Sequence, residues 1–162
     1  MSDNYYQNFY KLEMAMQDNI EHVLIYGGEA SGKADAIECC MKLLSNEHNV
    51  AVLTASSGLT RAAYPFNKVT CYNWNKDMKL IDPDWITEHY DIIIIDGFCV
   101  NWMEILDAFK TSRIIMSIRA NSLDEIPQDL KNAFGIKARS EIIKKDEHLK
   151  GITSVKKHLF RA

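Results

Sequence analysis

The sequence lacks the patterns that mark zinc-binding, disulfide-bonded and membrane-spanning proteins. Its four cysteines include an adjacent pair, Cys39 and Cys40, but no C-x-x-C motif, and its five histidines form no H-E-x-x-H motif. This spacing predicts reduced thiols rather than structural zinc or a disulfide framework. The four isoleucines from Ile92 to Ile95 form an apolar run far too short to cross a bilayer, which requires about 20 residues.

Targeting signals and repeats are also missing from the sequence. Residues 1–18 do not have the basic-then-apolar order of a secretory signal, and no repeat, low-complexity tract or linker follows them. The length of 162 residues suits one domain with a single substantial core. We therefore expect a single-domain protein of the cytoplasm with no transmembrane segment, and a peripheral position at the inner face of the membrane stays open.

Positive charge is scarce in most of the chain and concentrated at its end. From Lys137 onward there are eight Lys or Arg residues against three acids, whereas the preceding residues hold eleven basic and nineteen acidic side chains. A basic segment on an acidic domain could contact nucleic acid, acidic lipid or the acidic face of a neighbouring subunit. A solvated strand pair with its lysines facing water explains the same pattern equally well.

Apolar periodicity predicts strands that alternate with helices. This alternation is typical of an α/β fold in which helices sandwich a mostly parallel sheet. Residues 1–20 are expected to form an N-terminal helical segment, and residues 137–162 a basic β-hairpin. The strands are expected at 22–28, 49–55, 68–74, 91–98 and 113–120, the helices at 34–46, 83–90 and 101–111, and a helix or two short turns at 122–135.

The stretch GGEASGKA at residues 27–34 is one residue away from the phosphate-loop motif G-x-x-x-x-G-K-[ST]. It follows a predicted strand and opens a predicted helix, where backbone N–H groups and the helix N-terminus can surround a phosphate. Lys33 would reach the β- and γ-phosphates of ATP. The expected nucleotide-binding residues are Gly27, Gly28, Glu29, Ala30, Ser31, Gly32, Lys33, Ala34 and Asp35.

A candidate metal ligand follows the isoleucine strand. In phosphate-loop proteins an acid after a hydrophobic strand often holds Mg²⁺, so Asp96 is expected to do this beside the loop if the two strands are neighbours. Lys33 and Asp96 are thus the candidate catalytic residues. Ala34 lacks the hydroxyl that normally contacts Mg²⁺, and Gly97 stands where many hydrolysing relatives carry a glutamate. The sequence therefore favours nucleotide binding over hydrolysis.

From residue 23 to about residue 126, the order of elements resembles the secretion, or traffic, ATPase superfamily of type II secretion, type IV pili and conjugative type IV secretion. Residues 104–126 carry the likeness, with Arg119-Ala120-Asn121-Ser122 in the place of the family's His-Ala-Asn-Ser. The resemblance implies a RecA-like P-loop NTPase fold. It also implies assembly as a homo-oligomer or within a larger secretion ATPase complex.

Departures from the family surround the same pocket. Ala34 and Arg119 replace a hydroxyl residue and a histidine, and TASSGL follows the second strand where the family shows acids that help to activate water. The resemblance thus implies a short, degenerate member with weak or lost ATP hydrolysis and a regulatory or assembly role. Gly27, Gly32, Lys33, Asp96 and Asn121 are the positions onto which family roles carry over, and Arg119 is either a phosphate contact or a structural ion-pair partner.

Two other functions stay open. A DNA-handling ATPase of the initiator or helicase-loader type would use Arg139 as an inter-subunit finger and the basic end as a DNA contact. A non-enzymatic scaffold would keep the NTPase fold and bind an ATPase or a membrane complex through exposed aromatic residues. The candidates for that contact are Tyr5, Tyr6, Tyr64, Trp74 and Trp102.

Overall fold

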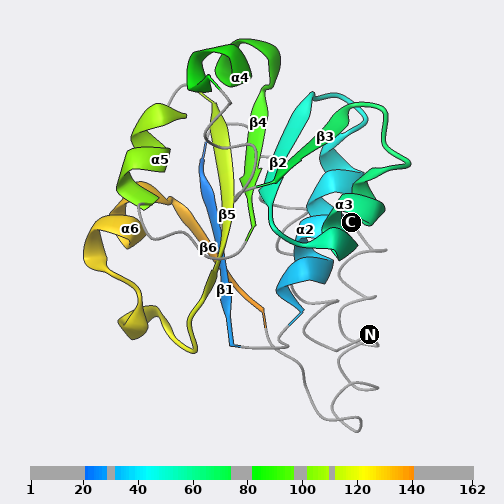
Figure 1. The fold of residues 1–162 in the computed structure, drawn as a ribbon. Helices are drawn as coiled ribbons and strands as arrows, with labels where there is room; N and C mark the ends of the chain where they lie inside the picture. Colours follow the sequence, from blue (N-terminus) through cyan, green and yellow to red (C-terminus); the bar gives the residue numbers. More distant parts are fainter. Residues whose placement is uncertain (1–20, 29–31, 74–81, 97–101, 110–111, 141–162) are drawn as a thin grey trace, which may run out of the picture.

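The computed structural model describes residues 21–28, 32–73, 82–96, 102–109 and 112–140 (Figure 1). The N-terminal segment expected at 1–20 and residues 141–162 of the expected hairpin lie outside these ranges. The strands are β1 Val23–Gly27, β2 Val50–Thr54, β3 Val69–Asn73, β4 Ile92–Ile95, β5 Arg113–Arg119 and β6 Ile136–Arg139. The helices are α2 Lys33–Leu44, α3 Ser57–Ala63, α4 Pro83–His89, α5 Trp102–Ala108 and α6 Gln128–Ala133, with a short 3-10 helix η1 at Leu123–Glu125.

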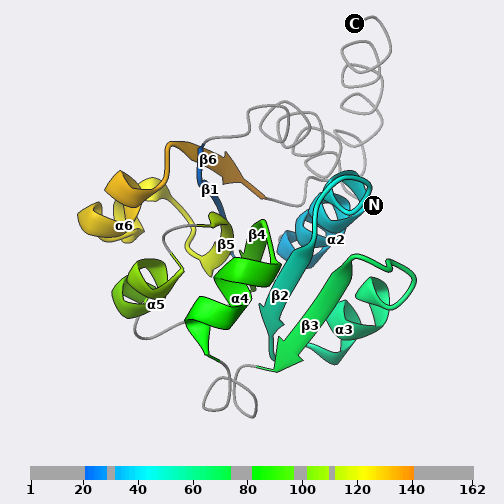
Figure 2. The same ribbon diagram turned by 90° about the horizontal axis from the view of Figure 1, so that it is seen from above.

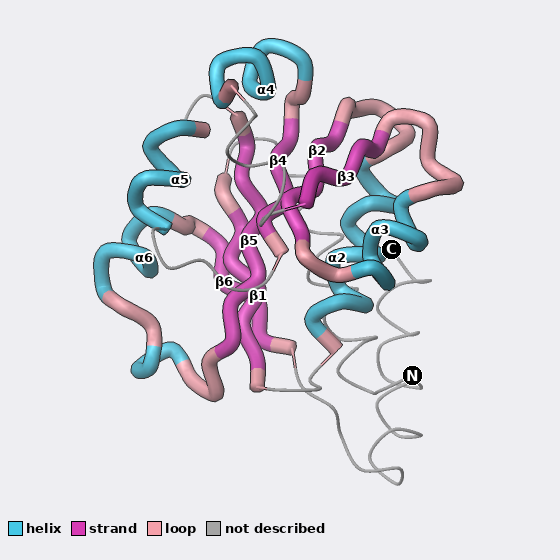
Figure 3. Tube along the Cα trace, in the orientation of Figure 1, coloured by secondary structure: helices cyan, strands magenta, loops and turns pink. Residues whose placement is uncertain are grey.

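The six strands form one sheet in the order β3-β2-β4-β5-β1-β6 (Figure 3). Every pair of neighbouring strands is parallel, so the strands all end at the same edge of the sheet. In Figure 1 this edge is the lower one, where β1 ends and α2 begins, while α4 lies at the opposite end. The α/β fold expected from the sequence is confirmed.

Helices lie on both faces of the sheet (Figure 2), and alternation along each strand divides the core between these faces. Ile92 and Ile94 pack with α2 and α3, whereas Ile93 and Ile95 pack with α4, α5 and α6. Both faces of the sheet are shielded from solvent, because the strands β1, β2 and β4 are buried along their whole length. This explains why these strands read as continuous apolar runs.

Local signals explain where several helices begin. The side chain of Asp82 accepts a hydrogen bond from the Asp84 N–H and Pro83 opens α4, as the Asp-Pro-Asp sequence predicts. The helix α3 was not expected, although Ser56 caps it by accepting from the Leu59 N–H. Pro127 separates η1 from α6, so the stretch 122–135 contains two short helical segments.

The hairpin expected from residue 137 begins with residues that belong to the parallel sheet. Lys137, Ala138 and Arg139 are part of β6, which pairs in parallel with β1, and residues 141–162 of the expected hairpin lie outside the described ranges. Lys137 has a structural contact, because its ammonium donates to the Phe134 carbonyl at 2.9 Å. A four-residue edge strand carries too little apolar periodicity to stand out in the sequence.

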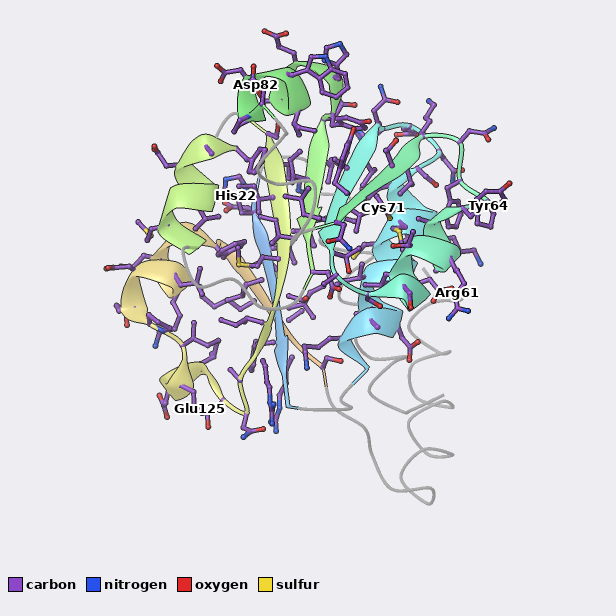
Figure 4. All side chains as sticks on the ribbon, viewed as in Figure 1. His22, Arg61, Tyr64, Cys71, Asp82 and Glu125 are labelled. Carbon is purple, nitrogen blue, oxygen red and sulfur yellow. The ribbon has the colours of Figure 1, made fainter. Side chains whose placement is uncertain are left out.

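The described part of the chain contains no helix long and apolar enough to cross a membrane. Cys40 and Cys71 are thiols, and burial raises the pKa of both, that of Cys40 far above its ordinary value. In the case of Cys71, the negative charge of Asp96 raises the pKa further, while a hydrogen bond with Thr60 opposes the rise. Tyr64, which follows α3, is 90% exposed (Figure 4), whereas Tyr5, Tyr6 and Trp74 lie outside the described residues.

Candidate functional site

Glycines form the two described ends of the candidate loop. Gly27 ends β1, and Gly32 is the N-cap of α2 with φ of 90°, a left-handed conformation that favours glycine. A Cβ added to Gly28 would lie 2.5 Å from the Asn121 Oδ1, so a larger residue there would displace the Asn121 side chain. Residues Glu29, Ala30 and Ser31 lie outside the described part of the loop. The expected strand–loop–helix arrangement is therefore present at both ends.

Lys33 turns back toward the start of the loop from the first turn of α2. Its Nζ donates to the carbonyl oxygens of Gly27 at 3.0 Å and Gly28 at 2.6 Å. The ammonium is thus held between the end of β1 and the N-terminus of α2, where the positive end of the helix also attracts an anion. Ala34 and Asp35 follow in the same turn, and both are exposed.

Asp96 follows β4, which does not neighbour the loop strand β1. The sequence places Asp96 beside the loop on the condition that the two strands are neighbours, and this condition is not met. The strand β5 lies between β1 and β4, so the strands that carry the loop and the acid are about 10 Å apart at the usual spacing. Alternation still places Asp96 on the face that α2 covers, two residues after Ile94. A metal ion at Asp96 would therefore lie across β5 from the loop.

Two hydroxyl groups hold the carboxylate of Asp96. Thr54, at the end of β2, donates to Asp96 Oδ2 at 2.6 Å, and Ser117, in β5, donates to Oδ1 at 3.2 Å. Both hydroxyl residues are about 1% exposed. The sequence analysis did not identify these two residues as part of the site. Strand alternation could have done so, because Thr54 and Ser117 stand two residues after the core residues Val52 and Ile115 and so share their face.

The strands on either side of β1 bring further polar residues to the loop. Asn121 follows β5, where its side chain packs against Gly28 and its N–H donates to the Glu125 carboxylate at 2.6 Å. Ser140 follows β6, and its hydroxyl lies 3.4 Å from the position of a Cβ on Gly32. Ser140 is buried and was not expected at the site. Figure 4 shows Glu125 at the same edge of the sheet.

The two candidate arginines belong to different faces of the sheet. Arg119 is in register with Gly27 and therefore lies on the face of the loop, whereas Arg139 is in register with Tyr26, whose side chain packs on the opposite face. Both side chains are exposed. The register thus places Arg119 on the face of the sheet that carries the loop and Arg139 on the opposite face.

No protein-family model matches the sequence, and none of the curated proteins shows significant similarity to it. Solved structures do match. The cytoplasmic domain of EssC aligns over 80% of this chain with a TM-score of 0.58 and 12% identity. The flagellar accessory protein FlaH from Methanocaldococcus jannaschii aligns over 76% with a TM-score of 0.51 and 14% identity.

The fold is that of a RecA-like P-loop NTPase. This chain spans 33% of the EssC domain and 72% of FlaH. A structure of RuvB from Thermotoga maritima also aligns, with a TM-score of 0.44 and 13% identity.

The residues at this edge fit a phosphate and a divalent cation. The glycines at both ends of the loop allow backbone to approach a phosphate, and the Lys33 ammonium supplies a positive charge beside it. Mg²⁺ prefers oxygen ligands and usually takes one or two carboxylates together with phosphates and water. Asp96 offers such a carboxylate on the same face, whereas Ala34 offers no hydroxyl.

Proposed function

We propose that this chain binds ATP with Mg²⁺ through residues 27–35, and that it hydrolyses the nucleotide slowly or not at all. The observation that carries the proposal is the position of Lys33, whose ammonium lies against the Gly27 and Gly28 carbonyls at the N-terminus of α2. A bound phosphate would replace these carbonyls as the partner of the ammonium and would also meet the positive end of the helix.

Slow hydrolysis is supported by the residues that stand where the traffic ATPases carry catalytic groups. Ala34 presents a methyl group in place of a metal-binding hydroxyl, and β2 ends in Thr54 where the family shows acids. The Thr54 hydroxyl donates to Asp96, so it acts as a hydrogen-bond donor there and not as a base. These substitutions favour holding a nucleotide over activating water.

We also propose a regulatory or assembly role beside an ATPase complex of the traffic type, with the chain as a homo-oligomer or as one subunit among others. The resemblance over residues 104–126 supports this role. One structural neighbour, FlaH, is named as a flagellar accessory protein, which agrees with a supporting role. Light scattering with and without Mg-ATP tests the homo-oligomer, because nucleotide-dependent assembly would raise the measured mass.

The binding proposal is tested by thermal unfolding with and without Mg-ATP. A ligand that binds the native state at 100 times its Kd adds about 2.7 kcal/mol, which raises Tm by roughly 5–10 °C for a chain of this size. We expect this rise in the wild type and its loss in Lys33→Ala. Lys42→Ala is the matched control, since Lys42 is exposed in the last turn of the same helix.

An unchanged Tm in the folded wild type would refute nucleotide binding. Hydrolysis is measured separately as phosphate release, where we expect the wild type to match Lys33→Ala. Rapid turnover that is lost in Lys33→Ala would contradict slow hydrolysis and leave the binding proposal intact.

A further inference from the structure

The carboxylate at the end of β4 is fixed from both neighbouring strands. Leu53 pairs with Ile95 and Ile95 pairs with Met116, so the next residues, Thr54, Asp96 and Ser117, stand in one row across the sheet. One hydroxyl donates to each carboxylate oxygen. Both hydroxyl groups are buried while Asp96 is only partly buried, so they reach the carboxylate from the core side.

The hydroxyl of Thr54 is itself held in one direction. Its oxygen accepts the Ser56 N–H at 2.9 Å, and its proton points to Asp96 Oδ2 at 2.6 Å. A carboxylate has about two acceptor positions on each oxygen. The hydrogen bonds from Thr54 and Ser117 therefore use one acceptor position on each oxygen of Asp96, and each oxygen can accept or ligate one further partner.

We propose that Thr54 and Ser117 are positioning residues that orient Asp96 to ligate the Mg²⁺ of a bound nucleotide. The inference rests on the proposed function. Mg²⁺ demands near-ideal octahedral geometry, so a ligand that can rotate binds it less well. The need for a fixed carboxylate is greater here, because Ala34 cannot supply a hydroxyl ligand from the loop.

The test measures the Kd of ATP for the full chain twice, in EDTA and in saturating Mg²⁺. The ratio of the two values isolates the contribution of the metal. Loss of residues that orient a metal ligand typically lowers metal affinity about 10- to 100-fold. We expect Thr54→Val to lower the Mg²⁺ enhancement of ATP affinity by about 10-fold and to leave the Kd in EDTA unchanged. Asp96→Asn removes the ligating carboxylate and sets the lowest Mg²⁺ enhancement that the other variants can show.

Two variants separate positioning from a general structural effect. Thr54→Ser keeps the donor hydroxyl and is expected to keep the Mg²⁺ enhancement. Thr70→Val makes the same change at an exposed position of the neighbouring strand β3 and is expected to behave as the wild type. Ser117→Ala removes the second donor without adding bulk and should reduce the enhancement even if Thr54→Val does not fold.

The results distinguish this inference from the proposed function. An equal Mg²⁺ enhancement in the wild type and in Ser117→Ala and any folded Thr54→Val protein overturns the positioning role, even though ATP binds. A wild type that binds ATP equally in EDTA and in Mg²⁺ also overturns it, because Asp96 then has no metal to orient. Failure to bind ATP under either condition refutes the proposed function instead, and the positioning role with it.

Discussion

His22 shows how a single side chain can make the stability of this fold depend on pH. Its Nδ1 accepts the Ile114 N–H at 3.0 Å, and its ring packs edge-on against Phe134. Burial lowers the pKa of His22 below its ordinary value of 6.5, and the positive charge of Arg113 lowers it further, while Glu21 partly opposes both. The folded protein therefore prefers the neutral ring. Figure 4 shows His22 beside the sheet.

The consequence for pH follows from this direction. Below pH 6.5 the unfolded chain takes up the His22 proton more readily than the folded one. The stabilisation is complete above pH 6.5 and is lost as the pH falls through the lower pKa of the folded state. We expect His22→Asn, which keeps an acceptor but does not titrate, to reduce the fall in the free energy of unfolding below pH 6.5, as measured by urea titrations. His89→Asn is the control, and an unchanged slope in His22→Asn would contradict the assignment.

At the scale of elements, strand alternation assigns the two arginines to different roles. Arg119 is in register with Gly27 and lies on the loop face, whereas Arg139 is in register with Tyr26 and lies on the other face. A hydrogen bond to a charged group contributes about 1.5–3 kcal/mol when buried and less at an exposed site. We expect Arg119→Ala to weaken ATP binding by roughly 3- to 10-fold and Arg139→Ala to leave it unchanged.

Isothermal titration of both variants measures this difference directly. The pair is well matched, since each arginine is exposed and ends a strand that neighbours β1. Equal losses of ATP affinity in the two variants would indicate a general effect of positive charge. A larger loss of ATP affinity in Arg139→Ala would mean that the phosphates contact the face of β6 that carries Arg139, and not the loop face.

Some helices and strands could be predicted from local sequence signals, whereas others depend on long-range contacts. Apolar runs and the Asp82 cap identified β1, β2, β4, β5 and α4 to within a few residues, because alternation and capping depend on near neighbours in the sequence. The helix α3 was missed, and the short edge strand β6 was expected only as the start of a hairpin. The four residues of β6 alternate apolar and charged side chains, but so short a run does not identify a strand, and its place is set by pairing with β1.

At the scale of the whole molecule, the sheet depends on hydrophobic packing on both faces. Phe109, just after α5, is fully buried against the face opposite the loop. Truncating a buried Phe to Ala typically costs about 3–5 kcal/mol, because it leaves a cavity as well as lost contacts. For a chain of this size, we expect Phe109→Ala to lower Tm by roughly 6–20 °C.

Differential scanning calorimetry measures this loss. Met103→Ala on the same helix is the control, because Met103 is 52% exposed and should change stability by less than about 0.5 kcal/mol. A loss in Phe109→Ala no larger than that of the control would show that this face contributes little to the fold.

From the sequence alone, most of the strands and helices can be predicted, together with a candidate phosphate loop that contains Lys33 and has Ala34 in place of the usual hydroxyl residue, since each depends on a few neighbouring residues. The separation of the loop strand from the acid strand by β5, and the hydrogen bonds of Thr54 and Ser117 to Asp96, become visible in the folded sheet. The partners in those hydrogen bonds are 42 and 21 residues apart. Strand order and register bring such residues together through packing across the whole sheet, and no local pattern specifies them.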